Sequence, residues 1–127
     1  MKRALLIPLV VLTAGSALAA GQASLNVYFQ SNLKDTAYQK KTFDRVAKAW
    51  KTPPASQVPE VGKKTVVQSV IAKDGKLVSA VVSMSSGKKG WDAAALAAVR
   101  SAAPFDPLPD SFAAPTIEVH FHVSVVP

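Results

Sequence analysis

The sequence feature that most constrains the fold is an alanine-rich stretch, "WDAAALAAVRSAAPFDPLP", from Trp91 to Pro109. Small residues recur in it at helical spacing and form one narrow stripe: Ala95, Ala98, Val99 and Ala102. Because small side chains let a helix lie close to a sheet, the stretch predicts a small domain with one layer of helices and one sheet. Pro104 ends the helix, and Phe105 and Leu108 are expected to fill the core where the alanines leave room.

A second helix is predicted to begin near Asp35 or Thr36. Thr36 and Gln39 have the spacing of a capping box, in which each side chain bonds the backbone of the other residue. Apolar residues follow on one helical face, and charged residues fill the other face. The apolar face consists of Phe43, Val46, Ala47 and Trp50. Two prolines, at positions 53 and 54, then end the helix.

Three strands are predicted, over residues 65–72, 77–84 and 116–126. An Asp74-Gly75 pair suits the tight turn between the first two. In the second strand, alternation places Val78, Ala80, Val82 and Met84 on one face. The last strand alternates most regularly, and its apolar face is formed by Ile117, Val119, Phe121, Val123 and Val125.

The order helix, strand, strand, helix, strand also predicts the topology. A right-handed crossover through the alanine-rich helix lays the last strand parallel to the second, with the first between them. This arrangement leaves the last strand at a sheet edge, where its outer backbone groups are unpaired.

The N-terminal segment has the three parts of a secretory signal. Lys2 and Arg3 precede an apolar run, and Ala17 and Ala19 flank Leu18 before the predicted cleavage. We therefore expect a signal peptide over residues 1–19, a linker over 20–33 and one domain over 34–127. The alternative is that the segment remains as a membrane anchor, although its seventeen-residue apolar stretch is shorter than the roughly twenty residues of a spanning helix.

Composition limits the function further. Removal of residues 1–19 takes away Lys2 and Arg3 but no acidic residue, so the formal net charge falls from +7 to +5. The remaining basic residues are scattered and are not interleaved with aromatics, which argues against nucleic-acid binding. The chain has no cysteine, so neither a disulfide framework nor thiol chemistry is available.

Three stretches resemble the C-terminal domain of the TonB and TolA proteins of Gram-negative envelopes: "VAKAWKTPP", "VIAKDGKLVSAVVSMSSG" and the alanine-rich stretch. The residues that carry the resemblance are Trp50, Asp74, Gly75, Ser86, Gly87, Asp92, Ala95, Ala98, Pro104, Phe105 and Pro109. The resemblance implies an α+β fold, with a three-stranded antiparallel sheet and two helices on one face. It also implies a domain that has no catalytic activity and no cofactor, and that binds partner proteins in the periplasm.

The leading hypothesis is a periplasmic interaction module that binds an envelope partner by strand addition, with a link to TonB-dependent transport across the outer membrane. The expected partner is a periplasmic or outer-membrane protein, and a homodimer through the same edge would compete with it. The predicted partner-binding residues lie on the last strand: Thr116, Glu118, His120, His122 and Ser124.

Two alternatives remain. In the first, the chain is a short energy transducer held in the inner membrane by an uncleaved N-terminal helix. In the second, His120 and His122 bind a metal, with Glu118 as a third ligand on the same face. The sequence has no other histidine, and catalytic zinc sites normally use three protein ligands, so we expect no metal site.

Overall fold

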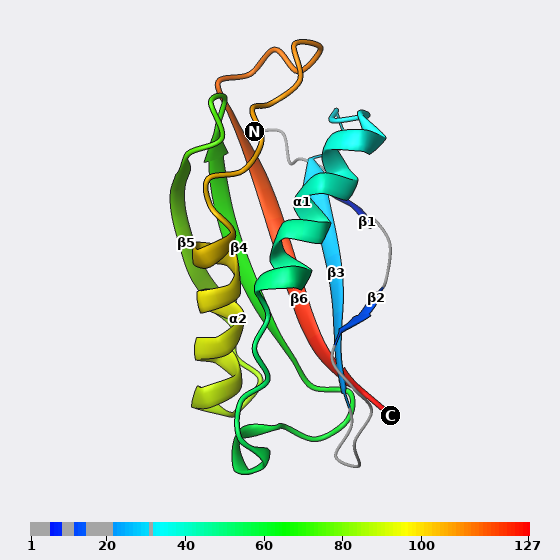
Figure 1. The fold of residues 1–127 in the computed structure, drawn as a ribbon, viewed down its shortest axis with the longest axis vertical. Coiled ribbons are helices and arrows are strands. Elements are labelled where there is room, and N and C mark those ends of the chain that lie inside the picture. Colours follow the sequence, from blue (N-terminus) through cyan, green and yellow to red (C-terminus); the bar gives the residue numbers. More distant parts are fainter. Residues whose placement is uncertain (1–5, 9–11, 15–21, 31) are drawn as a thin grey trace.

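The structure, a computed structural model, describes residues 6–8, 12–14, 22–30 and 32–127. Two helices, α1 (Thr36–Ala49) and α2 (Lys89–Ala102), lie on one face of an antiparallel sheet (Figure 1). Its four long strands are β3 (Gln22–Gln30), β4 (Lys64–Ala72), β5 (Leu77–Met84) and β6 (Thr116–Val126). Two three-residue strands, β1 (Leu6–Pro8) and β2 (Leu12–Ala14), pair with β3, and a 3₁₀ turn, η1, spans Ala55–Gln57.

The α+β class and the predicted order of three strands are confirmed. β4 lies between β5 and β6 and is antiparallel to both, so β5 and β6 are parallel, as the right-handed crossover requires. The predicted strand count is wrong, because β3 adds a fourth long strand on the far side of β6.

The strand β3 comes from residues that were predicted to form a linker. It pairs antiparallel with β6 from Gln22↔Val126 to Phe29↔Val119, without a break in register. Every second residue of β3 is buried in the core, namely Ala23, Leu25, Val27 and Phe29. This burial explains why the segment folds onto the sheet, since alternating apolar residues stabilise a strand with one buried face. The last strand is therefore an interior strand, and the expectation of a free edge on β6 is wrong.

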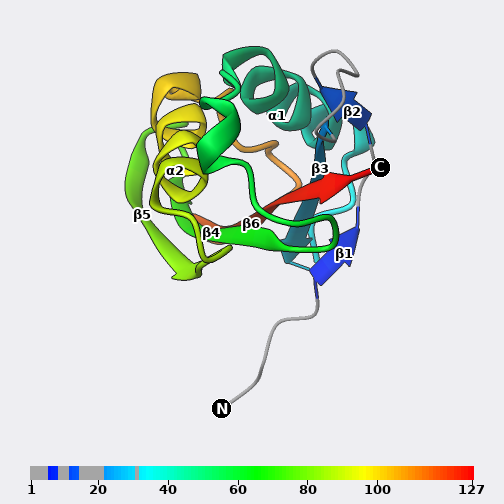
Figure 2. The same cartoon turned by 90° about the horizontal axis from the view of Figure 1, so that it is seen from below.

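The core lies between the sheet and the two helices (Figure 2). The predicted stripe of α2 is buried throughout, and Phe105 and Leu108 are buried beside it, as expected. Trp91, which the stripe did not include, is 1% exposed, and its Nε1 donates to the carbonyl of Val123 at 3.2 Å. Trp91 also meets Trp50, the C-cap of α1, edge to face, with ring centroids 4.9 Å apart, so it joins both helices to the sheet.

The start of α1 differs from the predicted capping box. Asp35 is the N-cap, and its Oδ1 accepts the backbone N–H of Tyr38 at 2.9 Å. The side chain of Gln39 donates to the carbonyl of Leu33 at 3.3 Å and does not return to Thr36. A carboxylate at the N-cap satisfies a free amide as well as a hydroxyl does, which is why either residue fits the sequence.

The predicted faces of β5 are also wrong in part, because two bulges interrupt its alternation. The register moves from Val66↔Met84 to Val67↔Val82, and again from Val70↔Ser79 to Ile71↔Leu77. Ser83 and Val78 are thus extra residues on β5, and each reverses the side to which later side chains point. As a result Ala80 and Val82 lie toward the core, whereas Val78 and Met84 are exposed.

Several residues of the family resemblance hold the turns in place. Gly75 has a φ of +95° in the β4–β5 turn, and Asp74 Oδ1 accepts the N–H of Lys76 at 3.0 Å. The N–H of Phe105 donates to the carbonyl of Gly75 at 2.9 Å, which docks the segment after α2 on the hairpin. In that segment Pro104 follows a cis peptide bond and the carbonyl of Pro109 accepts the N–H of Phe112.

Candidate functional site

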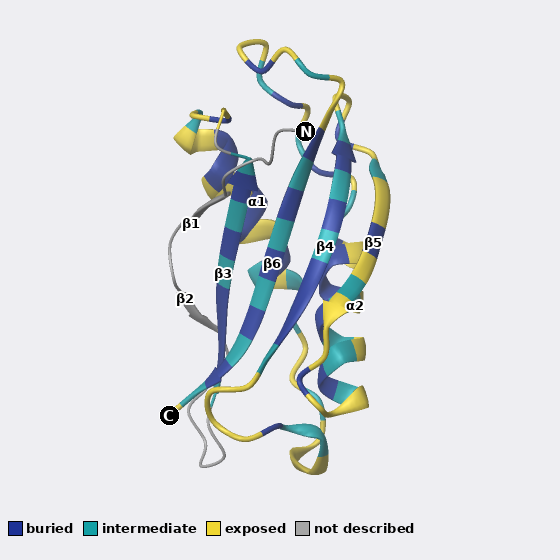
Figure 3. Cartoon of the chain, turned by 180° about the vertical axis from the view of Figure 1, so that it is seen from behind, coloured by how far each residue is buried: buried dark blue, intermediate teal, exposed yellow. Residues whose placement is uncertain are grey.

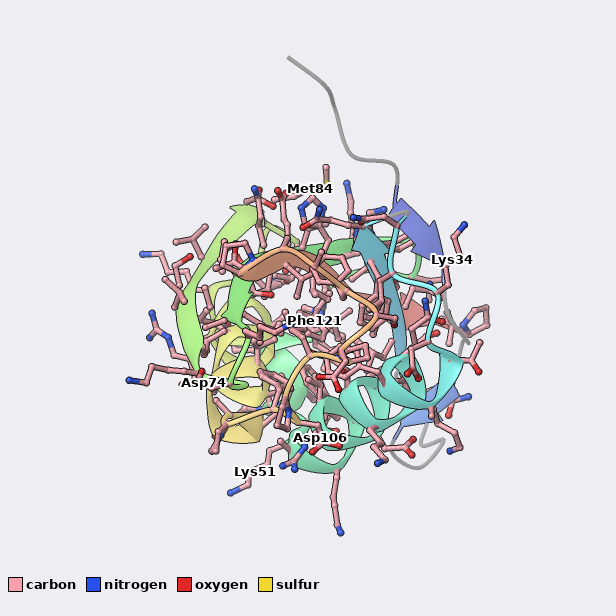
Figure 4. The ribbon with its side chains drawn as sticks, turned by 90° about the horizontal axis from the view of Figure 1, so that it is seen from above. Lys34, Lys51, Asp74, Met84, Asp106 and Phe121 are labelled. Atoms are coloured by element: carbon pink, nitrogen blue, oxygen red, sulfur yellow. The ribbon has the colours of Figure 1, made fainter. Side chains whose placement is uncertain are left out.

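The sheet face turned away from the helices carries most of the polar side chains of the strands. Figure 3 views this face directly, and in Figure 4 Met84 lies on it, across the core residue Phe121 from the helices. We call it the open face. Its residues are Ser24, Asn26 and Tyr28 of β3; Thr116, Glu118, His120, His122 and Ser124 of β6; Lys64, Val66, Gln68 and Val70 of β4; and Ser79, Val81 and Met84 of β5.

Two rows of side chains cross the open face from one strand to the next. The register places Asn26, His122, Val66 and Met84 in one row. The neighbouring row consists of Tyr28, His120, Gln68 and Val81. Met84 is 51% exposed and Val81 57%, so both rows end at β5 in large apolar side chains that contact solvent.

A polar network centred on Glu118, which pairs with Val70 next to the second row, includes His120 and Gln68 of that row. The Oε2 atom of Glu118 lies 2.5 Å from Nε2 of His120 and accepts Nε2–H of Gln68 at 3.1 Å. The N–H of Glu118 donates to Oε1 of Gln30 at 2.6 Å, so the network reaches from β3 to β4. Glu118 thus fixes the side chains of its neighbours on three strands.

His122 has a different environment from His120. Its ring centroid is 4.5 Å from that of Tyr28, with the ring planes tilted by 50°. Burial, together with smaller effects of the positive charge of Lys64 and of the neighbouring His120, lowers the pKa of His122 to about 4. At neutral pH, His122 is therefore an uncharged ring packed against an aromatic neighbour.

The five side chains predicted to bind a partner lie together on the open face, and all five belong to β6. Thr116 is exposed, and the other four are partly buried between their neighbours on β3 and β4. Their backbone, however, pairs with β4 on one side and with β3 on the other. A partner strand cannot pair with β6 while β3 remains in place.

Sequence reasoning missed the contribution of β3 to this face. Asn26 and Tyr28 extend the two rows by one strand, and Gln30 accepts from Glu118. The signal was present in the alternation of residues 22–30, where apolar residues fall at every second position from Ala23 to Phe29.

The structure also bears on the two alternative hypotheses, a metal site and a membrane anchor. Within the described ranges, no three His, Asp or Glu side chains are grouped closely enough to hold a metal ion. Among those same residues, no helix has the length and apolar character needed to cross a membrane. The predicted signal peptide lies largely outside the described residues, apart from β1 and β2.

Comparison with known proteins gives the family. A family model described as TonB C terminal matches residues 35–121, more than two thirds of the chain. No curated protein and no solved structure matches the chain. The match begins at the N-cap of α1 and ends within β6, so it includes α1, α2, β4 and β5 but excludes β3. The chain therefore belongs to the TonB C-terminal family, whose domains bind other proteins of the cell envelope and are not enzymes.

Proposed function

We propose that this protein is a periplasmic interaction module that binds an extended segment of another envelope protein by strand addition. The single observation that carries the proposal is the pairing of β3 with β6. Residues 22–30 lie outside the region that matches the family, yet they add to its last strand over eight paired positions. In this chain, the last strand of the family domain therefore already pairs with an extended segment, and that segment is β3 of the same chain.

The open face supports the same function through side chains. We propose that Thr116, Glu118, His120, His122 and Ser124 contribute to partner contact from this face, since β3 occupies the backbone edge of β6. The exposed side chains of Val81 and Met84 provide apolar area beside this polar strand. Polar groups near an apolar patch are typical of surfaces that bind proteins.

The N-terminal segment supports a location in the periplasm. The family belongs to the cell envelope, and the N-terminal segment has the charge and alanine pattern of a cleavable signal. We propose that residues 1–19 are removed and that the domain acts in the periplasm, on a periplasmic or outer-membrane partner. A connection with TonB-dependent transport is the function that this family and location favour.

Photo-cross-linking in cells tests the proposal. A photoreactive amino acid replaces Met84, which is exposed on the open face, and a matched variant carries it at Lys48, which is exposed on α1. We expect the Met84 variant to form an adduct with a periplasmic or outer-membrane protein and the Lys48 variant to form none. Adducts at Lys48 alone, or none at either position, would contradict the proposed use of the sheet.

A further inference from the structure

The two ends of the sheet differ as acceptors for another strand. At the β5 end, the bulges at Val78 and Ser83 leave a regular register only from Ser79 to Val82. Bulges twist an edge strand and interrupt its row of hydrogen-bonding groups, which protects it against further pairing. The outer edge of β5 is therefore a poor acceptor.

At the other end, β3 is regular over its whole length. Its nine residues, QASLNVYFQ, include no charged residue, no proline and no glycine. Its buried residues fix it to the core, and Val27 and Phe29 are 0% exposed. An uncharged edge strand with an unbroken register readily accepts another strand unless something covers it.

Two segments of the same chain cover this edge. β1 pairs antiparallel with Tyr28, Phe29 and Gln30, and β2 pairs antiparallel with Ala23, Ser24 and Leu25 (Figure 1). Both segments lie within residues 1–19, which we propose are removed on export. Because β3 begins at Gln22, cleavage after Ala19 would keep β3 and uncover its outer edge.

A small apolar hollow lies between the core side of β3 and α1. Ala23 and Leu25 line it from β3 and Val123 from β6, while Val46, Ala47 and the C-cap Trp50 line it from α1. The segments that pair here are Leu6–Pro8 and Leu12–Ala14. Because alternate residues of β3 face the core, alternate residues of a strand added beside it face the same side, which favours apolar residues at those positions.

We propose that the outer edge of β3 is where the mature protein binds its partner, an envelope protein that adds an extended, alternately apolar segment antiparallel to β3. The inference rests on the proposed function and moves the acceptor edge from β6 to β3. The mature chain has a formal net charge of +5, from thirteen basic and eight acidic residues. Since two such chains repel each other, a neutral or acidic partner is favoured over a second copy.

Disulfide trapping tests the proposal cleanly because the chain has no cysteine. The probe is a synthetic peptide of residues 6–14 in which cysteine replaces Pro8, the residue that pairs with Tyr28. Two lysines are added to its C-terminus for solubility. The protein is exported with its own N-terminal segment and purified from the periplasm. Its mass, measured by mass spectrometry, establishes where the chain is cut. The protein carries Tyr28→Cys, and a matched variant carries Ser101→Cys at an exposed position on α2, away from the sheet surface proposed to bind a partner.

In a buffer of reduced and oxidised glutathione, we expect the peptide to trap Tyr28→Cys at least about tenfold more than Ser101→Cys, since binding raises the local thiol concentration. Amide exchange on the wild-type mature chain provides a second measurement that needs no substitution. Addition of the wild-type peptide should slow exchange within Gln22–Gln30 and leave Leu77–Met84 unchanged.

Several outcomes would overturn the inference: equal trapping at both positions, unchanged exchange in β3, or Tyr28→Cys chains that link mainly to each other. Retention of residues 1–19 in the purified protein would also overturn it, because β1 and β2 would still cover the edge. If the open face forms partner adducts in cells but β3 traps no peptide, the proposed function stands and only this inference fails.

Discussion

Asp92 of α2 connects the helix to β4 and to the segment that follows β5. Its Oδ1 accepts Oγ1–H of Thr65 at 2.6 Å and both N–H and Oγ–H of Ser86 at 2.9 Å, and its Oδ2 accepts Oγ–H of Ser85. Burial raises the pKa of Asp92, but these hydrogen bonds outweigh burial and hold the pKa below its usual value. The carboxylate therefore stabilises the fold above the unfolded-state pKa, and this stabilisation is lost as pH falls through the lower folded-state pKa.

Replacement of Asp92 should show the size of this effect. Asp92→Ala leaves the buried hydroxyl of Thr65 without its acceptor, so we expect a loss of about 2–3 kcal/mol in the free energy of unfolding at neutral pH. Urea unfolding measures the loss, and Asp110→Ala, at an exposed carboxylate, is the control. A loss no larger than that of the control would contradict the role given to Asp92.

Gly75 is constrained by both conformation and space. A Cβ at this position would lie 2.0 Å from the carbonyl oxygen of Phe105, and φ is +95°. Gly62 has the same φ but has no atom within 4 Å of such a Cβ, so Gly62→Ala isolates the cost of conformation. We expect Gly62→Ala to cost about 1–2 kcal/mol and Gly75→Ala clearly more, because the hairpin must move away from Phe105. Similar midpoints in urea for both variants would show that the contact with Phe105 is unimportant.

His122 gives a prediction on pH. Its pKa of about 4 in the folded protein lies below the ordinary value of 6.5, so between these values the unfolded chain binds a proton that the folded protein does not. Stability should therefore fall as pH decreases from about 6.5 toward 4. We expect His122→Gln to reduce this dependence when urea midpoints at pH 7 and pH 5 are compared. An equal loss in wild type and variant would mean that His122 titrates normally.

At the scale of elements, sequence reasoning succeeded where one period continued without interruption. The stripes of α1 and α2 and the alternation of β6 were predicted correctly, because each has a single buried face along its whole length. It failed on β5, since two bulges change the facing of residues without any change of composition. It also failed on β3, whose alternation was present but whose position between a predicted signal and a predicted helix favoured a linker.

The packing of β3 against the core can be measured by its contribution to stability. Phe29 is 0% exposed and meets Tyr38 of α1 edge to face, with ring centroids 6.3 Å apart. Phe29→Ala should therefore lower the free energy of unfolding by about 3–5 kcal/mol, as loss of a buried aromatic ring does. Tyr28→Ala, on the open face of the same strand, should cost less. If both substitutions are nearly neutral, β3 is not part of the core.

For the whole molecule, the candidate site could be predicted only in part from the sequence. The pattern of β6 correctly placed Glu118, His120 and His122 on one face. It did not show which edge of the sheet is open, because that depends on a strand outside the family domain. An edge is a property of the assembled sheet, and one added strand transfers it to a different segment of the chain.

The pairing of β3 with β6 closes the edge of the last strand within the chain itself. Amide hydrogen exchange on the mature protein, followed residue by residue, tests it most directly. We expect slow exchange for all paired amides of β6 from Val119 to Val126, together with those amides of β3 that face β6. Fast exchange throughout Gln22–Phe29, with every second amide of β6 unprotected, would contradict it and leave the last strand at the edge of the sheet.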